Sequence, residues 1–319
     1  MMTKGCAEMG SVLTGKTDSA LSIKFKMLQN KRYFEGYVMV LPFILLFAVF
    51  VIIPVVWGLV LSLTHYNMMQ TMLWAGFSNY IELFLNDDLF ITALRNTVWF
   101  AAIAGPIGFL ASFFFAWVIN QLKFRDAFSL AFYAPSIVSG IAISIIWLYL
   151  FSSDRLGLVN STLLDLGFIS EPMLWTMDPQ LIMPLIIVIS VWMSLGTGFL
   201  TNLAGLSNIN IELYEAGAID GVKNKFQELY YITYPQMKPQ LLFNAIMSTV
   251  ASLNVHEIAV TVAGFPSPDY SAHTLVGHMY DHGFIRFELG YASAIAFVLF
   301  LMNFLLGRLF MRLFSTKDE

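Results

Sequence analysis

Long stretches without a charged residue are the feature that most limits what this chain can fold into. A helix needs roughly 20 mostly apolar residues to cross the hydrocarbon layer of a membrane. Five uncharged windows meet or approach that length: Tyr37–Leu63, Thr97–Leu122, Ala127–Ser153, Pro179–Ile211 and Leu289–Gly307. One more apolar window, Pro239–Pro268, which is the fifth in chain order, contains a single carboxylate, Glu257. The sequence therefore predicts an all-α, polytopic membrane protein with six transmembrane helices.

Composition agrees with a chain that uses the bilayer as its solvent. Hydrophobic residues make up 58% of the 319 residues and charged residues only 12%, whereas soluble domains average about 45–50% and about 25%. The net charge is −4, and no basic block suggests a nucleic-acid partner. Cys6 is the single cysteine, which excludes an intramolecular disulfide and a cysteine-based metal cluster.

The placement of lysine and arginine predicts the orientation. The chain contains 17 such residues, and only Arg95, Arg155 and Arg286 fall on one side of the predicted membrane. Because basic residues concentrate on the cytoplasmic side, both termini and the loop around Glu215 are expected in the cytoplasm. The predicted organisation is an N-terminal tail (residues 1–36), a six-helix domain (37–314) with a long loop (207–239), and a short C-terminal tail (315–319).

The loop between the fourth and fifth windows has its own helical pattern. Asn208 or Asn210 can cap a short helix, and Gly221 is expected to end or bend it. Pro235 and Pro239 are expected to stop a second, amphipathic stretch before the fifth window. The apolar residues of that stretch are Phe226, Leu229, Tyr230 and Ile232. Taken alone, this pattern also fits a pair of helices that rest on the membrane surface.

The residue order of the loop resembles the coupling segment of ATP-binding-cassette (ABC) importer permeases. In the family, that segment reads Glu-Ala-Ala, then Asp-Gly-Ala, then Phe, and finally Ile-x-Leu-Pro-x-x-x-Pro. This chain departs from the pattern at three positions: Gly217 and Val222 replace alanine, and Tyr234 replaces leucine. The residues that match are Glu215, Ala216, Asp220, Gly221, Phe226, Ile232, Pro235 and Pro239. The resemblance implies that a partner ATPase contacts Glu215, Ala216, Gly217, Asp220, Gly221, Phe226 and Pro235.

Nearly the whole chain from residue 37 onward resembles the carbohydrate-type, maltose-permease-like branch of these permeases. The supporting segments include Ala75–Tyr80, Ala93–Thr97, Gly157–Asn160, Ala204–Leu206 and Gly290–Ala292. The resemblance implies the type I ABC importer permease fold in a prokaryotic cell membrane. It also implies a second homologous permease, two cytoplasmic ATPases and an extracytoplasmic solute-binding protein. ATP and magnesium would bind to the ATPases, so this chain is expected to hold no cofactor and no catalytic residue.

The same resemblance implies that the third to fifth helices line a sugar path. The candidates are Ser139, Ser144, Trp192, Thr197, Asn254 and Glu257. Glu257 is expected either within the outer half of the fifth span, where an ionisable group is costly, or at a helix end. Two other functions stay open: an ion-coupled carrier or channel that uses Glu257, and a scaffold or sensor that carries no solute.

Two further patterns are interpreted as having no function of their own. Gly10–Thr17 fits the phosphate-binding pattern G-x-x-x-x-G-K-[ST], but that motif works only between a buried strand and a helix. His278 and His282 are four residues apart, with Asp281 between them and His273 upstream. These residues are expected in a solvated external loop, or in contact with a binding protein, so no metal site is predicted.

Overall fold

The computed structural model describes residues 36–314 and separates the chain into two compact units, residues 1–58 and 59–319. The described part of the first unit belongs to a 27-residue apolar helix, Gly36–Ser62. This helix includes a π-helical turn, η1 (Ala48–Ile52), followed by α2 (Ile53–Ser62). The turn lies just ahead of Pro54, whose missing N–H removes one regular helical hydrogen bond. Gly10–Thr17 and Cys6 lie outside the described residues.

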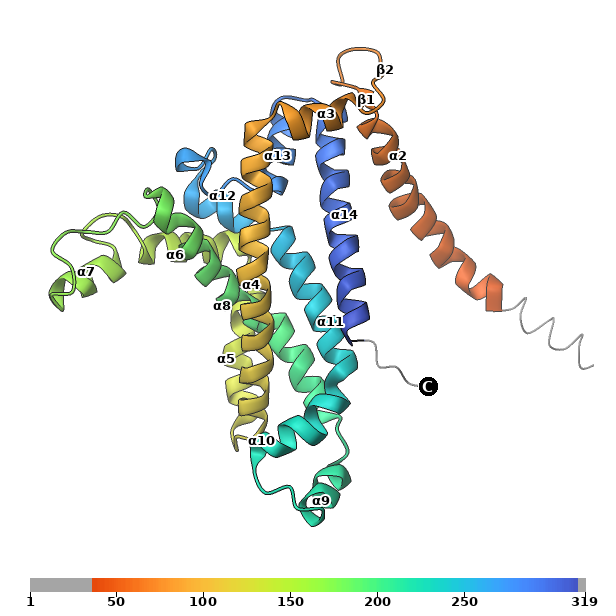
Figure 1. Ribbon diagram of the computed structural model, residues 1–319. Coiled ribbons are helices and arrows are strands. Elements are labelled where there is room, and N and C mark those ends of the chain that lie inside the picture. The colour runs from red at the N-terminus through yellow and green to blue at the C-terminus, as the bar shows by residue number, and fades with distance from the viewer. Residues whose placement is uncertain (1–35, 315–319) are drawn as a thin grey trace, which may run out of the picture. The chain divides into compact units, whose positions relative to one another are not determined.

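Four long helices form the body of the second unit (Figure 1): α4 (Asp88–Asn120), α8 (Pro179–Ser207), α11 (Tyr234–Leu253) and α14 (Leu289–Phe314). Helix α4 packs chiefly against α8 and α11, and α11 packs against α14. Because the apolar faces of these helices meet along their lengths, the core of this unit lies between them.

Shorter elements lie at the two ends and along one flank of this body. One end carries a two-stranded antiparallel hairpin, β1 (Thr64–His65) and β2 (Leu73–Trp74), and the all-α prediction is otherwise confirmed. The remaining elements are α3 (Ser78–Leu85), α5 (Arg125–Ile137), α6 (Gly140–Leu150), α7 (Leu158–Asp165), α9 (Ile211–Ile219), α10 (Lys225–Glu228), η2 (Leu229–Thr233), α12 (Glu257–Ala263), η3 (Pro268–Tyr270), α13 (Leu275–Tyr280) and η4 (Asp281–Ile285).

The predicted membrane windows are helical, but two of them are interrupted. Within residues 36–314, four helices are long and apolar enough to span, and Lys225–Leu253 with Glu257–Ala263 is a pair bent by 42°, either a broken fifth span or a re-entrant loop. The window Ala127–Ser153 was predicted as one continuous helix, and that is wrong. The backbone is extended at Val138 and Ser139, so the window divides into α5 and α6.

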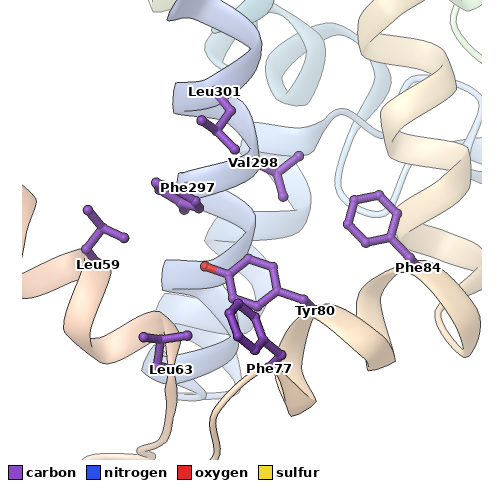
Figure 2. A pocket seen from close by; sticks show the side chains of 8 residues that line it. All are labelled: Leu59, Leu63, Phe77, Tyr80, Phe84, Phe297, Val298 and Leu301. Carbon is purple, nitrogen blue, oxygen red and sulfur yellow. The ribbon is translucent and has the colours of Figure 1, made fainter.

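An apolar recess of about 580 Å³ lies where the end of α2 meets α3 and α14. Figure 2 shows the eight side chains that line it, with Leu59 and Leu63 on one side and Phe297 on another. The Tyr80 hydroxyl donates a hydrogen bond to Ser62 Oγ at 2.7 Å, so its polar end is satisfied. The remaining surface offers only apolar contacts, which suits lipid chains.

The connection after α6 is held by one buried amide, that of Asn160 on α7. Its Nδ2 donates to the carbonyls of Ser152 and Asp154, each at 3.1 Å, and of Met173 at 3.0 Å. Its Oδ1 accepts from the Met173 amide at 3.1 Å and from Trp175 Nε1 at 2.9 Å. A single side chain therefore fixes two loops and the start of α7.

We expect Asn160→Ala to lower the free energy of unfolding by about 2–4 kcal/mol, because buried donors and acceptors lose their partner. The thermal unfolding midpoint of the detergent-purified chain measures this loss. Ser161→Ala is the matched control, since its Oγ bonds only to the Leu158 carbonyl at the surface. Equal midpoints for the two variants would contradict the assignment.

Candidate functional site

Helix α9 is a short capped helix at the end of the second unit opposite α3 and α13 (Figure 1). The Asn210 side chain accepts a hydrogen bond from the Glu212 amide at 3.1 Å and so caps the first turn. At its other end Gly221 has a φ of +96°, a backbone conformation that favours glycine. The predicted helix, its asparagine cap and its terminating glycine are all confirmed.

Two contacts stabilise α9 and its connection to the helical segment that follows. Tyr214 Oη and Thr233 Oγ1 are 3.0 Å apart, and the Val222 amide donates to the Gly217 carbonyl at 2.9 Å. A Cβ on Gly217 would lie 2.6 Å from Ile232 Cδ1, so the glycine allows α9 to pack closely against η2. The Gly217 departure from the permease pattern therefore has a packing consequence.

The segment after α9 continues directly into the fifth span. Helix α10 is capped by Asn224, whose Oδ1 accepts from the Gln227 amide at 2.8 Å, and η2 connects α10 to α11 without a break. The expectation that Pro235 and Pro239 stop the element is wrong. Both prolines lie inside the continuous helix Lys225–Leu253, Pro235 just after the π-helical turn η2 and Pro239 further along α11. Membrane helices tolerate such interior prolines.

The coupling residues predicted from the sequence lie on the surface of this loop. Gly217 is half-buried, and the other predicted coupling residues are exposed: Glu215, Ala216, Asp220, Gly221, Phe226 and Pro235. Phe226 is 72% exposed although its ring also contacts Trp117, with centroids 5.5 Å apart. Ile219 and Tyr230, which were not predicted, add apolar surface. Exposed apolar patches of this kind mark contacts with other proteins or with a membrane.

A cavity of about 540 Å³, lined by apolar and polar side chains, lies between α4, α8, α11 and the start of α12. Its polar lining residues are Ser112, Ser190, Ser194, Thr197, Thr201, Asn244, Ser248, Ser252, Asn254, His256 and Glu257. Of the six residues predicted for a sugar path, Thr197, Asn254 and Glu257 line this cavity. Hydroxyl, amide and carboxylate groups thus converge in one space among apolar helices.

The other three predicted path residues lie elsewhere. Ser139 is exposed in the break before α6, and Ser144 is buried within α6, where its Oγ has no hydrogen-bond partner among the described residues. Trp192 packs edge-on against Trp147, with ring centroids 5.4 Å apart. None of the three lines the cavity, so the structure separates the predicted set into two groups.

Glu257 begins α12 after the break at Asn254–His256, so the expectation of a position inside a continuous span is corrected. The other expectation was a helix end near the external interface; Glu257 is indeed at a helix end, and this end lies on the wall of the cavity. A Cβ on Gly140 would lie 2.9 Å from Glu257 Oε2, so this carboxylate lies against the first residue of α6. The two interrupted windows therefore meet at one carboxylate on the cavity wall.

Sequence reasoning missed Ser112 and Asn244 in the cavity lining, and Asn202 beside them. Asn244 Nδ2 donates to Ser112 Oγ at 3.1 Å, and Asn202 Nδ2 donates to the same oxygen at 3.4 Å. A Cβ on Gly198 would lie 2.9 Å from Asn244 Oδ1, so the glycine makes room for the amide. Asparagines inside the apolar windows were the signal that could have found this group, because polar residues within a membrane tend to face a cavity.

The histidines between α12 and α14 are buried, so the expectation of a solvated loop is wrong. His273, His278 and His282 are 5%, 1% and 6% exposed. His278 Nε2 lies 2.9 Å from Asp87 Oδ2, which also accepts a hydrogen bond from Tyr291 Oη at 2.6 Å. Sequence spacing gave no sign of this grouping, because Asp87 lies far away along the chain.

Burial sets the protonation of this histidine group. It lowers the pKa of His273 to about 4. Burial also lowers the pKa of His278, although the neighbouring Asp87 carboxylate opposes the shift. For Asp87, burial raises the pKa, but hydrogen bonds from Tyr291 and the Phe90 amide outweigh it and hold the pKa below its ordinary value. Near neutral pH, the His273 and His278 rings are therefore uncharged and the carboxyl group is ionised.

Membrane-length helices around this cavity, with an exposed capped helix at one end, define a multi-pass membrane transport component. The profile described as "Binding-protein-dependent transport system inner membrane component" matches residues 104–317. The chain belongs to this family, and it is a carbohydrate-type ABC transporter permease.

Relatives and solved structures agree with this assignment. The lactose transport system permease protein LacF of Rhizobium radiobacter is 34% identical over 91% of this chain and 97% of its own. The arabinooligosaccharides transport system permease protein AraP of Bacillus subtilis (strain 168) is 32% identical over 83% and 84%. A chain of a bacterial ABC transporter involved in the import of the acidic polysaccharide alginate shares the fold, with a TM-score of 0.77, 22% identity and 91% and 98% coverage.

We expect Gly221→Ala to destabilise the end of α9 by about 1–2 kcal/mol, because a Cβ is disfavoured at positive φ. Hydrogen exchange of the Asp220 and Val222 amides measures this loss of stability. A loss of about 1–2 kcal/mol corresponds to exchange that is about 5- to 30-fold faster. Gly221→Asn is the graded control, since asparagine tolerates positive φ better than alanine. Unchanged exchange in both variants would show that the turn is not held as described.

Proposed function

We propose that this chain and a second homologous permease together form the translocation path of an ATP-driven importer for carbohydrates. A solute-binding protein would deliver the solute on the outside, and two cytoplasmic ATPases would drive the cycle. Both termini and α9 would face the cytoplasm. The observation that carries the proposal is α9 itself, a capped and exposed helix that is followed by a continuous segment, α10 to α11, into the cavity wall.

Support for the binding protein comes from a related complex. Another chain from a bacterial alginate ABC transporter, in complex with an alginate pentasaccharide-bound periplasmic protein, shares the fold with a TM-score of 0.73 and 24% identity. The family description likewise names a binding-protein-dependent system.

The loop supplies a mechanical connection from the ATPases to the cavity. The nine residues of α9 would extend about 13 Å along a groove of the ATPase. Motion of α9 would pass to η2 through the Tyr214–Thr233 contact and the close packing of Gly217 on Ile232. Because η2 continues into α11, which carries Asn244 into the cavity, this motion would change the shape of the cavity wall.

The cavity lining favours an uncharged, polyhydroxylated solute. Serine, threonine and asparagine groups can donate to or accept from sugar hydroxyls, and Glu257 can accept from them. No lysine or arginine of the described chain lines the cavity, so a phosphate or carboxylate on the solute would lack a positive partner. The names of LacF and AraP, which refer to lactose and arabinooligosaccharides, support a neutral sugar.

We expect Glu215→Ala to uncouple ATP hydrolysis from uptake, because Glu215 would make a charge-assisted contact with a basic residue of the ATPase. Loss of one such hydrogen bond costs about 1.5–3 kcal/mol, which corresponds to a roughly 10- to 150-fold weaker coupling contact. Proteoliposomes that hold the assembled transporter measure sugar uptake and ATP hydrolysis together. Gly221→Pro should have the same effect through the turn.

Glu212→Ala is the matched control for this experiment. It removes an equal charge from the same helix, but Glu212 lies in the first turn beside the Asn210 cap. Undiminished uptake by Glu215→Ala and Gly221→Pro at normal expression would refute the coupling role of α9.

The family assignment disfavours the ion-coupled carrier considered from the sequence, and the role of the Glu257 carboxylate in the cavity can be tested directly. For the importer, we expect uptake to need ATP and to persist when a protonophore dissipates the proton gradient. Glu257→Gln should raise the KM for sugar about tenfold, because a charge-assisted hydrogen bond is weakened, and should leave the ATP requirement intact. Uptake that needs no ATPase and collapses with the protonophore would favour the carrier. A chain without any flux in the complete assembly would be a scaffold or sensor.

A further inference from the structure

Three potential metal ligands converge at the end of the second unit opposite α9. Asp87 caps the N-terminus of α4, His278 lies on α13, and His282 lies one helical turn further along, in η4. One ligand atom from each lies within 4.8 Å of the other two. His278 and His282 are both more than nine-tenths buried. The group therefore joins two distant parts of the chain through side chains that metal ions use.

The outer ring nitrogens of both histidines are held by partners of their own. His282 Nδ1 lies 2.7 Å from Glu288 Oε2, and His278 Nδ1 lies 3.1 Å from His273 Nε2. Metal-bound histidines are oriented in this way, through a hydrogen bond from the second ring nitrogen to a carboxylate or another acceptor. This leaves Nε2 of each ring as the ligand atom.

The carboxylate of Asp87 divides its two oxygens between separate tasks. Oδ1 accepts from the Phe90 amide at 2.8 Å and caps α4. Oδ2 faces the histidines and is fixed by Tyr291 Oη. The helix cap thus holds the carboxylate in place while Oδ2 remains directed at the two rings.

A cavity of about 410 Å³ opens onto the three side chains. Its other lining groups include the polar side chains of Asn67, Gln70 and Asn86. Two histidines, one carboxylate and an open position are a ligand set that zinc adopts, and other first-row divalent ions accept the same donors. The cavity has room for water as the remaining ligand.

We propose that Asp87, His278 and His282 bind a first-row divalent metal ion of the Zn²⁺ class. Ligand atoms around tetrahedral zinc lie about 3.3 Å apart, as follows from a Zn–N distance of about 2.05 Å. The Asp87 Oδ2–His278 Nε2 distance, now 2.9 Å, would widen slightly, and the other ligand-atom distances, now at most 4.8 Å, would shorten by up to about 1.5 Å to reach that geometry. The ion would clamp the start of α4 to α13 and η4. None of the three ligands lines the cavity between α4, α8 and α11, so this site is separate from the proposed transport path.

Metal binding is tested on the full chain, purified with a histidine-free affinity tag and carrying Cys6→Ser to remove the single thiol. Competition for Zn²⁺ with a chromogenic chelator gives the stoichiometry and affinity. We expect one Zn²⁺ per chain, and X-ray absorption should show only nitrogen and oxygen ligands at about 2.0–2.2 Å. Asp87→Asn and His282→Gln should lose the bound ion.

Glu288→Gln tests the site without disturbing buried packing, because the Glu288 side chain is half-exposed. It should weaken Zn²⁺ binding about 10- to 100-fold, the usual effect of removing such an orienting group. His256→Gln is the matched control, since His256 lies outside the three-ligand group, and it should leave the affinity unchanged. Absence of Zn²⁺ binding by the parent chain, or equal affinity in all four variants, would overturn the proposal.

Discussion

Hydrocarbon leaves no water to satisfy a backbone N–H or C=O, and the rest of the structure depends on this constraint. Regular helices therefore run through the long apolar windows, and irregular backbone is restricted to places with a polar neighbour. The break at Asn254–His256 lines the cavity, and the break at Val138–Ser139 comes directly before Gly140, which also lines it. Glu257 lies against the start of α6, where the positive end of the helix favours a carboxylate. The contact between Glu257 and the start of α6 thus joins the two breaks at the cavity wall.

One continuous helical segment joins the loop after α9 to the wall of the cavity. Lys225–Leu253 runs from the surface beside α9 to the wall that contains Asn244 and Ser252. Prolines inside this segment do not interrupt it, since neighbouring helices support the freed backbone groups. A rigid connection of this kind transmits a displacement, whereas a segment interrupted at Pro235 and Pro239 would absorb it. The continuity of the helix through both prolines therefore supports transmission of a movement of α9 to the cavity wall.

The sequence was sufficient wherever local rules decide the outcome. Hydropathy located the helical windows, and the Asn210 cap and Gly221 turn followed from side-chain chemistry within a few residues. It was insufficient where partners are distant along the chain. Ser112, Asn202 and Asn244 come from three different helices and meet only after packing. The break in the third window was missed for a similar reason, because it adjoins a carboxylate contributed by the fifth.

Asp87 shows how such a distant contact gives polar residues a structural reason to be buried. Without α13, it would be an ordinary helix cap, with Oδ1 on the Phe90 amide and Oδ2 in water. Packing replaces that water with Tyr291 Oη and the His278 ring. A partly buried carboxylate is costly unless it is well hydrogen-bonded, and here the hydrogen bonds to Asp87 outweigh the effect of burial on its pKa. A cation between Asp87, His278 and His282 would add a further partner for the negative charge that these contacts already hold in place.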